Sequence, residues 1–362
     1  MINGSIKLLS SIFGLTLILT AAGSVLPQAK PKAAPTPEKT APVVPPSTPM
    51  VKGKPMIKVK PMPKVFAEVG PSGVTEKSIA VDSRVNVTLP CVSQGDVKIT
   101  GWQRNEVRVF IKDGSRVSFT VRQKSSKSEK PVWVVLSSFD SEKTPPGAAS
   151  DCIWGDEIQI DAPVGAEISM KGRETTTLVD DVRKAMIVSV GGDISLRNVS
   201  EGINAKTFEG DLVVENSQGP MNLETTSGNI IAFGVEPGDV GDTFKAKTTS
   251  GTISLQSLEY RQTEANSVSG SVVFNGSILN GGSYSFNTTN GSIKLSVPEN
   301  TACFVTATYG PGSLNSDIPI KEITENVTPG PVKTTRGTLG KGGDATLKLT
   351  TNSGSILIRK QQ

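Results

Sequence analysis

Apolar residues follow a series of glycines along the chain at fixed positions. Ten glycines have apolar side chains two and four residues after them: Gly95, Gly192, Gly210, Gly219, Gly228, Gly251, Gly270, Gly282, Gly291 and Gly354. A repeat of two residues is the signature of a β-strand and turns both apolar side chains to the same face. The pattern therefore predicts ten short strands that each bury one face. No part of the chain has sustained helical periodicity.

One glycine of the series departs from this register. After Gly202 the apolar residues Ile203 and Ala205 come at the first and third positions instead. The strand that follows Gly202 is therefore expected either to carry a β-bulge or to begin from a different turn.

The spacing of the glycines predicts the architecture. Taking every second turn, the intervals from Gly192 through Gly210, Gly228, Gly251 and Gly270 to Gly291 are 18, 18, 23, 19 and 21 residues. A unit of about 20 residues with two short strands is typical of one coil of a flattened solenoid. We predict an all-β fold, a two-sheeted parallel β-solenoid over residues 66–362 with an irregular N-terminal cap. An antiparallel β-sandwich gives a similar spacing and is the alternative.

The regular spacing of the turn glycines is interrupted near the C-terminus. Gly291 and Gly354 are 63 residues apart, and the segment 298–345 between them contains five prolines. We expect this segment to include an excursion from the stack.

Polar residues precede the turn glycines in a repeated pattern. Thr-Thr-Ser-Gly occurs at 225–228 and at 248–251, with related sequences at 267–270, 288–291 and 351–354. Glycine allows a positive φ at a corner, and Ser, Thr and Asn side chains hydrogen-bond to nearby backbone. Stacked in register, these residues would form polar ladders along one edge, and we interpret them as structural.

From Gly95 to the C-terminus the sequence resembles the domain of unknown function 4097 (DUF4097), a family of adhesin-like bacterial β-strand-repeat proteins. The resemblance is carried by 95–102, 158–166, the Gly-Asp-Ile and Ser-Gly-x-Ile repeats, and 340–356. Each motif is short, so the specificity lies in their order over about residues 80 to 360. The resemblance implies a right-handed β-solenoid and an envelope location, and it transfers no catalytic residues.

The N-terminus predicts export. Lys7 precedes an apolar stretch from Leu8 to Thr20, and small residues follow at 21–24. This arrangement is typical of a cleaved signal peptide, which we place at residues 1–23. An uncleaved anchor is the alternative and the only membrane contact that the sequence predicts. The mature protein is expected to be extracytoplasmic: periplasmic, on the cell surface or secreted.

A segment rich in proline and lysine follows at residues 24–65. Between residues 30 and 65 there are ten prolines and eight lysines but only one glutamate. Such a composition favours extended, unpacked chain, and we predict a disordered stalk. The whole chain has a net charge of +4, so the stalk accounts for the excess and the remainder is mildly acidic. A nucleic-acid partner is therefore not expected.

The residue types restrict the chemistry. The chain has no histidine, which excludes Ser-His-Asp and Cys-His catalysis and histidine-ligated zinc. Of its three cysteines, Cys91 and Cys152 can form one disulfide after export, whereas Cys303 lies in an apolar run and is interpreted as a buried thiol. No cofactor is predicted.

Asp193 and Asp211 form the one candidate carboxylate pair. Each directly follows a turn glycine and they are one coil apart, so their side chains would stack about 5 Å from each other. Paired carboxylates can bind Ca²⁺ or cleave glycosides. The same corner position carries Asn, Thr or Ser in other coils, which favours a structural role instead.

Three tryptophans, Trp102, Trp133 and Trp154, fall in the first part of the fold. They could line a ligand groove, but we expect them to cap the open N-terminal edge of the solenoid.

Together these features predict a non-enzymatic, adhesin-like envelope protein that presents a polar solenoid to an envelope polysaccharide or another cell-surface polymer. A carbohydrate-active enzyme using Asp193 and Asp211 and an envelope-stress sensing ectodomain are the alternatives.

Overall fold

The computed structural model describes residues 66–69, 73–124, 130–138, 152–239, 241–327 and 332–361. These residues form 26 strands and no helix, and they belong to one compact unit, Pro61–Gln362. The predicted signal peptide and the whole of the predicted stalk lie outside the described residues. Within the described part of the chain, no helix is present that could cross a membrane.

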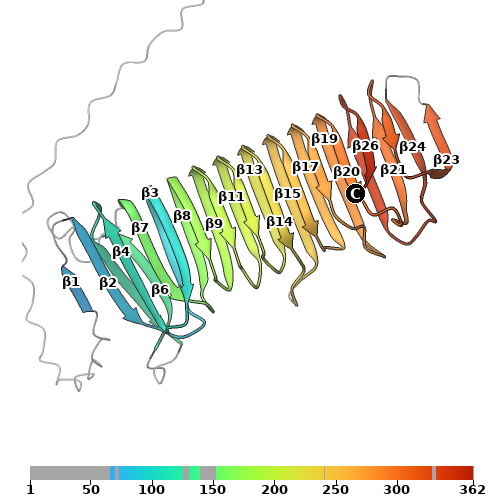
Figure 1. Ribbon diagram of the computed structural model, residues 1–362. Coiled ribbons are helices and arrows are strands. Elements are labelled where there is room, and N and C mark those ends of the chain that lie inside the picture. The colour runs from blue at the N-terminus through green and yellow to red at the C-terminus, as the bar shows by residue number, and fades with distance from the viewer. Residues whose placement is uncertain are drawn as a thin grey trace, which may run out of the picture. The chain divides into compact units, whose positions relative to one another are not determined.

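The central part of the unit is a stack of parallel rungs, each with one strand in each of two sheets (Figure 1). The strands of the first sheet are β9 (Lys184–Gly191), β11 (Ile203–Glu209), β13 (Met221–Ser227), β15 (Thr243–Ser250), β17 (Gln262–Ser269) and β19 (Ser283–Asn290). Those of the second sheet are β10 (Ile194–Arg197), β12 (Leu212–Glu215), β14 (Ile230–Val235), β16 (Ile253–Leu258), β18 (Val272–Asn275) and β20 (Ile293–Val297). The predicted parallel β-solenoid is confirmed.

The core lies between the two sheets. Ile194 pairs with Leu212, and Ala205 with Leu223, so that equivalent apolar residues stack directly on one another. These four side chains are completely buried. The alternation that follows the corner glycines therefore separates core from surface as predicted.

Gly202 turns differently from the other corners, and its strand has no bulge. Ile203 pairs with Met221 and the register continues without a shift through Thr207. The one-residue offset of the apolar positions after Gly202 is therefore taken up in the corner, where Gly202 lies beside Pro220. The apolar side chains of the strand stay in register with those of the neighbouring strands.

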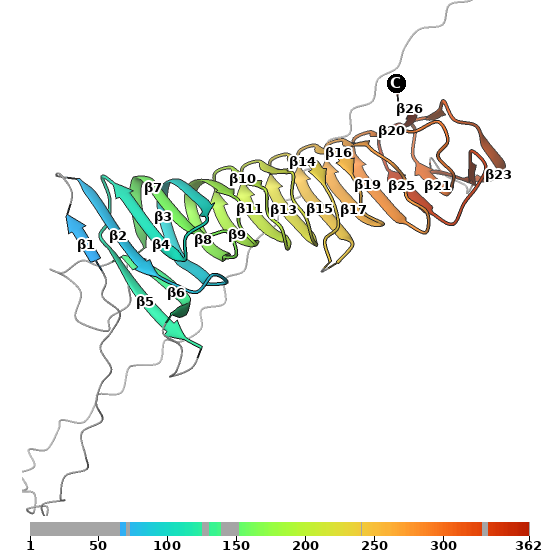
Figure 2. The same cartoon turned by 60° about the horizontal axis from the view of Figure 1, so that its bottom comes forward.

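Antiparallel strands cover the N-terminal end of the stack (Figure 2). There β8 (Glu167–Asp180) spans both sheets, β3 (Asn86–Trp102) pairs with it, and β6 (Pro131–Ser138) and β7 (Ile153–Pro163) pair with β3, all in parallel. Outside them lie β1 (Phe66–Val69), β2 (Val74–Ala80), β4 (Glu106–Lys112) and β5 (Val117–Gln123), all antiparallel to their neighbours. The predicted irregular cap is thus an antiparallel sheet.

The predicted aromatic capping of this edge is wrong. Trp133 and Trp154 are 39% and 46% exposed, and Trp102 is half-buried against the guanidinium groups of Arg104 and Arg108. The antiparallel strands of the cap hydrogen-bond to the backbone groups of this edge directly, which gives the protection that was expected from the tryptophan rings.

At the C-terminal end the order of the rungs departs from the order of the chain. After β20 the chain forms β21 (Cys303–Tyr309) and β22 (Leu314–Ser316), then an antiparallel pair of β23 (Ile320–Val327) and β24 (Lys333–Leu339). It then returns to place β25 (Thr346–Thr351) between β19 and β21, and β26 (Ile356–Lys360) between β20 and β22. The last rung in sequence is therefore inside the stack.

The excursion expected over 298–345 is present as the antiparallel pair of β23 and β24, whereas β21 and β22 of the same segment belong to the parallel stack. Strands β21 and β22 form the outermost rung, and β24 extends the sheet by pairing antiparallel with β21. Among the strands of the described residues, antiparallel pairing is confined to the two ends, apart from a single bridge between Gly238 and Gly241. The sandwich alternative therefore does not describe the fold.

Candidate functional site

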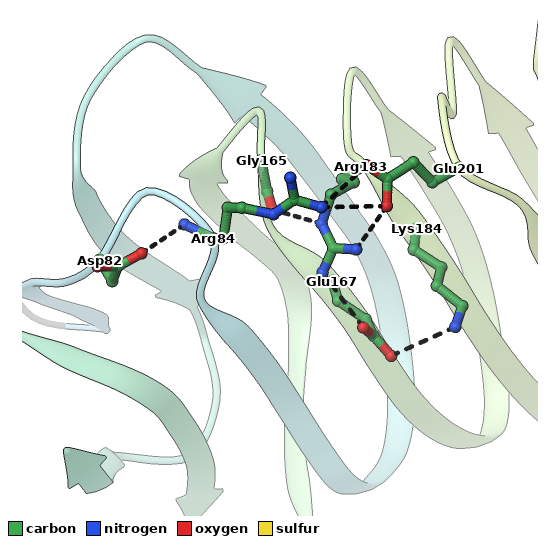
Figure 3. A network of polar contacts seen from close by, with 7 residues as sticks. All are labelled: Asp82, Arg84, Gly165, Glu167, Arg183, Lys184 and Glu201. Carbon is green, nitrogen blue, oxygen red and sulfur yellow. Dashed lines mark hydrogen bonds and ion pairs between the residues drawn. The ribbon is translucent and has the colours of Figure 1, made fainter. Parts of the chain in front are cut away.

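Charged side chains form a ladder along the corner where the strands of the first sheet begin (Figure 3). Arg183 donates from Nε to the carbonyl oxygen of Gly165 at 2.9 Å and from Nη1 to Oε2 of Glu201 at 2.7 Å. Arg84 reaches Oε1 of the same carboxylate at 2.9 Å, and Glu167 pairs with Arg183 at 3.3 Å. The hydrogen bond from Arg183 lowers the pKa of Glu201 below its ordinary value. The ladder ties together four consecutive corners.

A groove continues from this ladder along the same corner. It consists of two hollows of about 450 and 520 Å³ that share Thr243 and Lys245. The first hollow is lined by Lys184, Glu201, Gly202, Ile203, Asn204, Pro220, Met221, Asn222, Thr243 and Lys245. The second is lined by Asp242, Thr243, Phe244, Lys245, Arg261, Gln262, Thr263, Glu264, Gly281, Ser283 and Ser285. We call the two together the corner groove.

The corner groove crosses six rungs, those of β9, β11, β13, β15, β17 and β19. With a strand spacing of about 4.8 Å, five steps make it roughly 24 Å long. Its direction is along the stack and not along any strand. A ligand that fills it must therefore be extended.

Longer corners coincide with the second hollow. The coils that end at Gly251 and Gly291 are 23 and 21 residues long, whereas the other coils from Gly192 onwards have 18, 18 and 19 residues. Their extra residues fall in the corners that carry Asp242 and Gly281, which line the hollow. Asp242 accepts the Arg261 backbone amide at 2.7 Å and pairs with its guanidinium at 3.3 Å, which fixes one wall.

Buried aromatic residues support the groove from below. The rings of Phe244 and Tyr260 are 5.6 Å apart. The Tyr260 hydroxyl donates to the carbonyl oxygen of Gly219 at 2.6 Å, and the Tyr284 hydroxyl donates to that of Tyr260 at 2.8 Å. Burial raises the pKa of both tyrosines, so both stay neutral. The floor is therefore held in one arrangement before any ligand arrives.

The groove surface offers amides and ion-paired charges. Asn204, Asn222 and Gln262 supply amide groups that can both donate and accept hydrogen bonds. Glu201 and Asp242 are already paired with arginines. Such a lining suits a ligand rich in hydroxyl groups.

Asp193 and Asp211 lie at the opposite corner, where the first-sheet strands end, and neither lines the corner groove. Asp193 Oδ1 accepts the backbone amide of Asp211 at 2.8 Å, and Asp211 Oδ1 accepts that of Asn229 at 2.7 Å. Asn229 in turn accepts the amide of Thr252 at 2.9 Å. The structure thus brings the two carboxylates together as members of a polar ladder that holds successive corners.

The cysteines are placed as follows. Cys91 and Cys152 are joined in a disulfide with their Cα atoms 4.7 Å apart, which ties β3 to the start of β7. Cys303 is a buried free thiol at the start of β21. Among the described residues, no group of three or more Cys, Asp or Glu side chains is arranged to hold a metal ion.

Comparison with known proteins finds a family model that matches part of the chain. Residues 189–359 match the model of the Toastrack DUF4097 family. The predicted family resemblance is confirmed. The matched residues run from the end of β9 to β26, so the corner groove lies almost entirely within the Toastrack region. No curated protein matches the chain at a significant level.

Solved structures give weaker likenesses. A candidate cell adhesion protein from Clostridium sporogenes ATCC 15579 is 9% identical, with a TM-score of 0.25, covering 80% of this chain and 100% of that one. A candidate adhesin from Bacteroides fragilis NCTC 9343 is 12% identical, with a TM-score of 0.37, over 80% and 98% of the two chains. Another from Parabacteroides distasonis ATCC 8503 is 12% identical, with a TM-score of 0.28, over 79% and 98%. At these scores the likeness carries no argument about function.

Sequence reasoning missed the corner groove. The one available signal was the lengthening of two coils from 18 to 23 and 21 residues. Extra residues in a solenoid fall in corners, where they can raise walls, but the interval alone does not say on which side they project.

Proposed function

We propose that the protein is an exported, non-enzymatic, adhesin-like envelope component that binds an extended polysaccharide along its corner groove. The observation that carries the proposal is that two adjoining hollows, which meet at Thr243 and Lys245, together cross six rungs. A compact ligand would need only one hollow, whereas a polymer chain uses the whole length.

The chemistry of the lining supports a carbohydrate ligand. Asn204 and Asn222 occupy equivalent positions on the neighbouring strands β11 and β13, and Gln262 supplies a third amide two rungs farther along the groove, beside Thr243. A polymer of similar units can present a hydroxyl group to each of them in turn. The buried aromatic residues and their hydrogen bonds hold the second hollow in one shape before binding, which limits the ordering cost.

The placement of the acids supports a binding role over an enzymatic one. Strand β11 separates the Asp193–Asp211 corner from the corner groove, and its seven residues span roughly 20 Å. A polymer in the groove would therefore not reach these carboxylates. Both are also engaged by backbone amides of the next rung.

Export is supported by the predicted signal peptide and by the proximity of Cys91 to Cys152. Disulfides persist mainly in oxidising compartments outside the cytoplasm. The periplasm, the cell surface and the medium are equally consistent with these observations.

The test is binding as a function of ligand length. Purified envelope polysaccharides, cut to defined oligomers, are titrated into the protein by calorimetry. We expect affinity to rise with oligomer length until the groove is filled and then to level off. An affinity that is already complete for the shortest oligomer would contradict an extended site.

Two variants localise the binding. Asn222→Ala and Gln262→Ala remove amides from the two hollows and are each expected to weaken binding of long oligomers about 5- to 10-fold, the value of one or two hydrogen bonds. Gln256→Ala removes an exposed amide from the second sheet and serves as the control. Equal losses in all three variants would show that the groove is not the site.

A further inference from the structure

Five exposed apolar side chains lie on one face of the first sheet, four of them close together on β9 and β11. Met186, Val188 and Val190 alternate along β9 and are 38%, 46% and 58% exposed, and Phe208 on β11 is 55% exposed. Val190 lies beside Phe208, because the residues on either side of them pair as Ser189–Thr207 and Gly191–Glu209. Trp133 is on the same face but on β6, three strands from β9, and its Nε1 donates to the Thr88 hydroxyl of β3 at 3.0 Å. We call these five residues the apolar patch.

The apolar side chains of Met186 and Val188 do not recur in later rungs, although single exposed apolar residues such as Val268 do occur there. Farther along the same sheet, the equivalents of Met186 and Val188 are Asn222 and Glu224 on β13, then Lys245 and Lys247 on β15. Solvent-facing positions of a soluble sheet are normally of that kind, and an exposed apolar cluster marks a contact surface. Nothing in the core requires these side chains, since they point away from it.

Basic residues border the apolar patch. Lys171 on β8 pairs with Val188, and Arg173 is two residues farther along β8. Lys206 on β11 pairs with Val188 from the other side, and the Arg122 guanidinium lies 5.8 Å from the Trp133 ring. Lys206 also forms an ion pair with Glu224 at 3.1 Å, whereas Lys171 and Arg173 are exposed.

We propose that the apolar patch and its basic border dock the solenoid onto an anionic lipid surface. Regular parallel strands present the residues on a broad face, which suits a planar partner better than a point ligand. Lysine and arginine beside aromatic and aliphatic side chains are the combination that binds acidic head groups and inserts at the interface. This contact is separate from any N-terminal anchor, and it does not depend on the polysaccharide proposal.

The experiment uses the full chain and vesicles of phosphatidylcholine with or without phosphatidylglycerol. Because the lysine-rich N-terminal segment can also attract acidic vesicles, the readout must report on the patch itself. Val190→Cys carries an environment-sensitive fluorophore at the patch. Thr249→Cys, which occupies the equivalent outward position on β15, carries it in the control.

We expect acidic vesicles to shift the emission of the Val190 probe to the blue and to leave the Thr249 probe unchanged. The shift should weaken as salt is raised. An unchanged Val190 probe on vesicle-bound protein, or an equal shift at both positions, would overturn the proposal.

Charge variants provide the second arm. The double variant Lys171→Gln, Arg173→Gln should bind acidic vesicles more weakly by a factor on the order of 20. Each basic residue at an acidic lipid surface strengthens binding about fivefold, and the two factors multiply. The control combines Lys98→Gln with Lys294→Gln, exposed positions on β3 and β20 in the second sheet that carry the same change in charge. A reduction of the same size in the control would show a general charge effect and refute docking by this face.

Discussion

The Thr225 hydroxyl donates a hydrogen bond of 3.0 Å to the carbonyl oxygen of Gly210, one rung earlier in the stack. The same bond recurs from Thr248 to Gly228, from Ser267 to Gly251 and from Thr288 to Gly270. The repeated Thr-x-Ser-Gly turn sequence therefore has a specific role: its first residue faces inward and ties each corner to the one before it.

Thr225→Val should lower the free energy of unfolding by about 1 kcal/mol. The substitution keeps the shape of the buried side chain but leaves the Gly210 carbonyl without this donor. Urea denaturation followed by circular dichroism measures the change. A midpoint equal to that of the wild type would show that the ladder of hydroxyls contributes nothing.

Thr263→Val is the matched substitution with the opposite expected sign. Thr263 is also buried, between the register positions of Phe244 and Tyr284, but its hydroxyl has no hydrogen-bond partner in the described structure. Removing an unsatisfied buried hydroxyl should raise the free energy of unfolding by about 1 kcal/mol. A loss of stability similar to that of Thr225→Val would mean that a water molecule satisfies this hydroxyl.

Gly210→Ala should destabilise the stack by more than about 2 kcal/mol, through backbone strain and a steric clash together. Gly210 has a φ of +134°, and a Cβ there would collide with the carbonyl oxygen of Gly192. Gly281→Ala is the control, because Gly281 also has a positive φ, +69°, but no atom lies within 4 Å of its Cβ position. Thermal unfolding of the two variants should therefore show the larger loss at Gly210. Equal losses would assign the whole effect to backbone conformation.

Reduction of the Cys91–Cys152 disulfide should destabilise the N-terminal cap. The bond closes a loop with a sequence separation of 61 residues, and loop-closure entropy for that length corresponds to about 4 kcal/mol. Urea midpoints with and without dithiothreitol measure the effect, and Cys91→Ser with Cys152→Ser should reproduce the reduced value. An intact midpoint in reductant, with free thiols counted to prove reduction, would show that strand pairing alone holds the cap.

Cys303 should make stability fall in alkaline solution. Burial raises the pKa of its thiol from 9.0 to about 11, because the thiolate is disfavoured in the core. The contribution of this group is therefore complete below pH 9 and is lost as the pH rises through 11. The free energy of unfolding of the wild type is compared with that of Cys303→Ala between pH 8 and 11. Because both proteins share all other alkaline effects, the difference gives the contribution of the Cys303 thiol. The native thiol should also resist alkylation at pH 8 and react after unfolding in urea.

The solenoid rungs follow from local features of the sequence. Apolar residues two and four places after Gly210 and Gly228 are buried, and the turn residues before those glycines form the expected ladders. Each rung contacts mainly its neighbours, so a pattern of about 20 residues carries the information for it. For the same reason Asp193 and Asp211 could be placed side by side before the structure was known.

The order of the rungs at both ends, the corner groove and the apolar patch depend on tertiary structure. Nothing near Thr346 in the sequence says that β25 enters between β19 and β21, because every unpaired strand edge offers the same backbone donors and acceptors. The corner groove forms where corners of unequal length are neighbours in successive rungs. The apolar patch forms because Trp133 and Val190, which are distant in the sequence, lie on one face of the folded stack. The sequence by itself determined which side chains point inward and where each corner turns, since both are set within a few residues. Only the folded stack decided which surfaces lie together, because that depends on pairing between edges far apart in the chain.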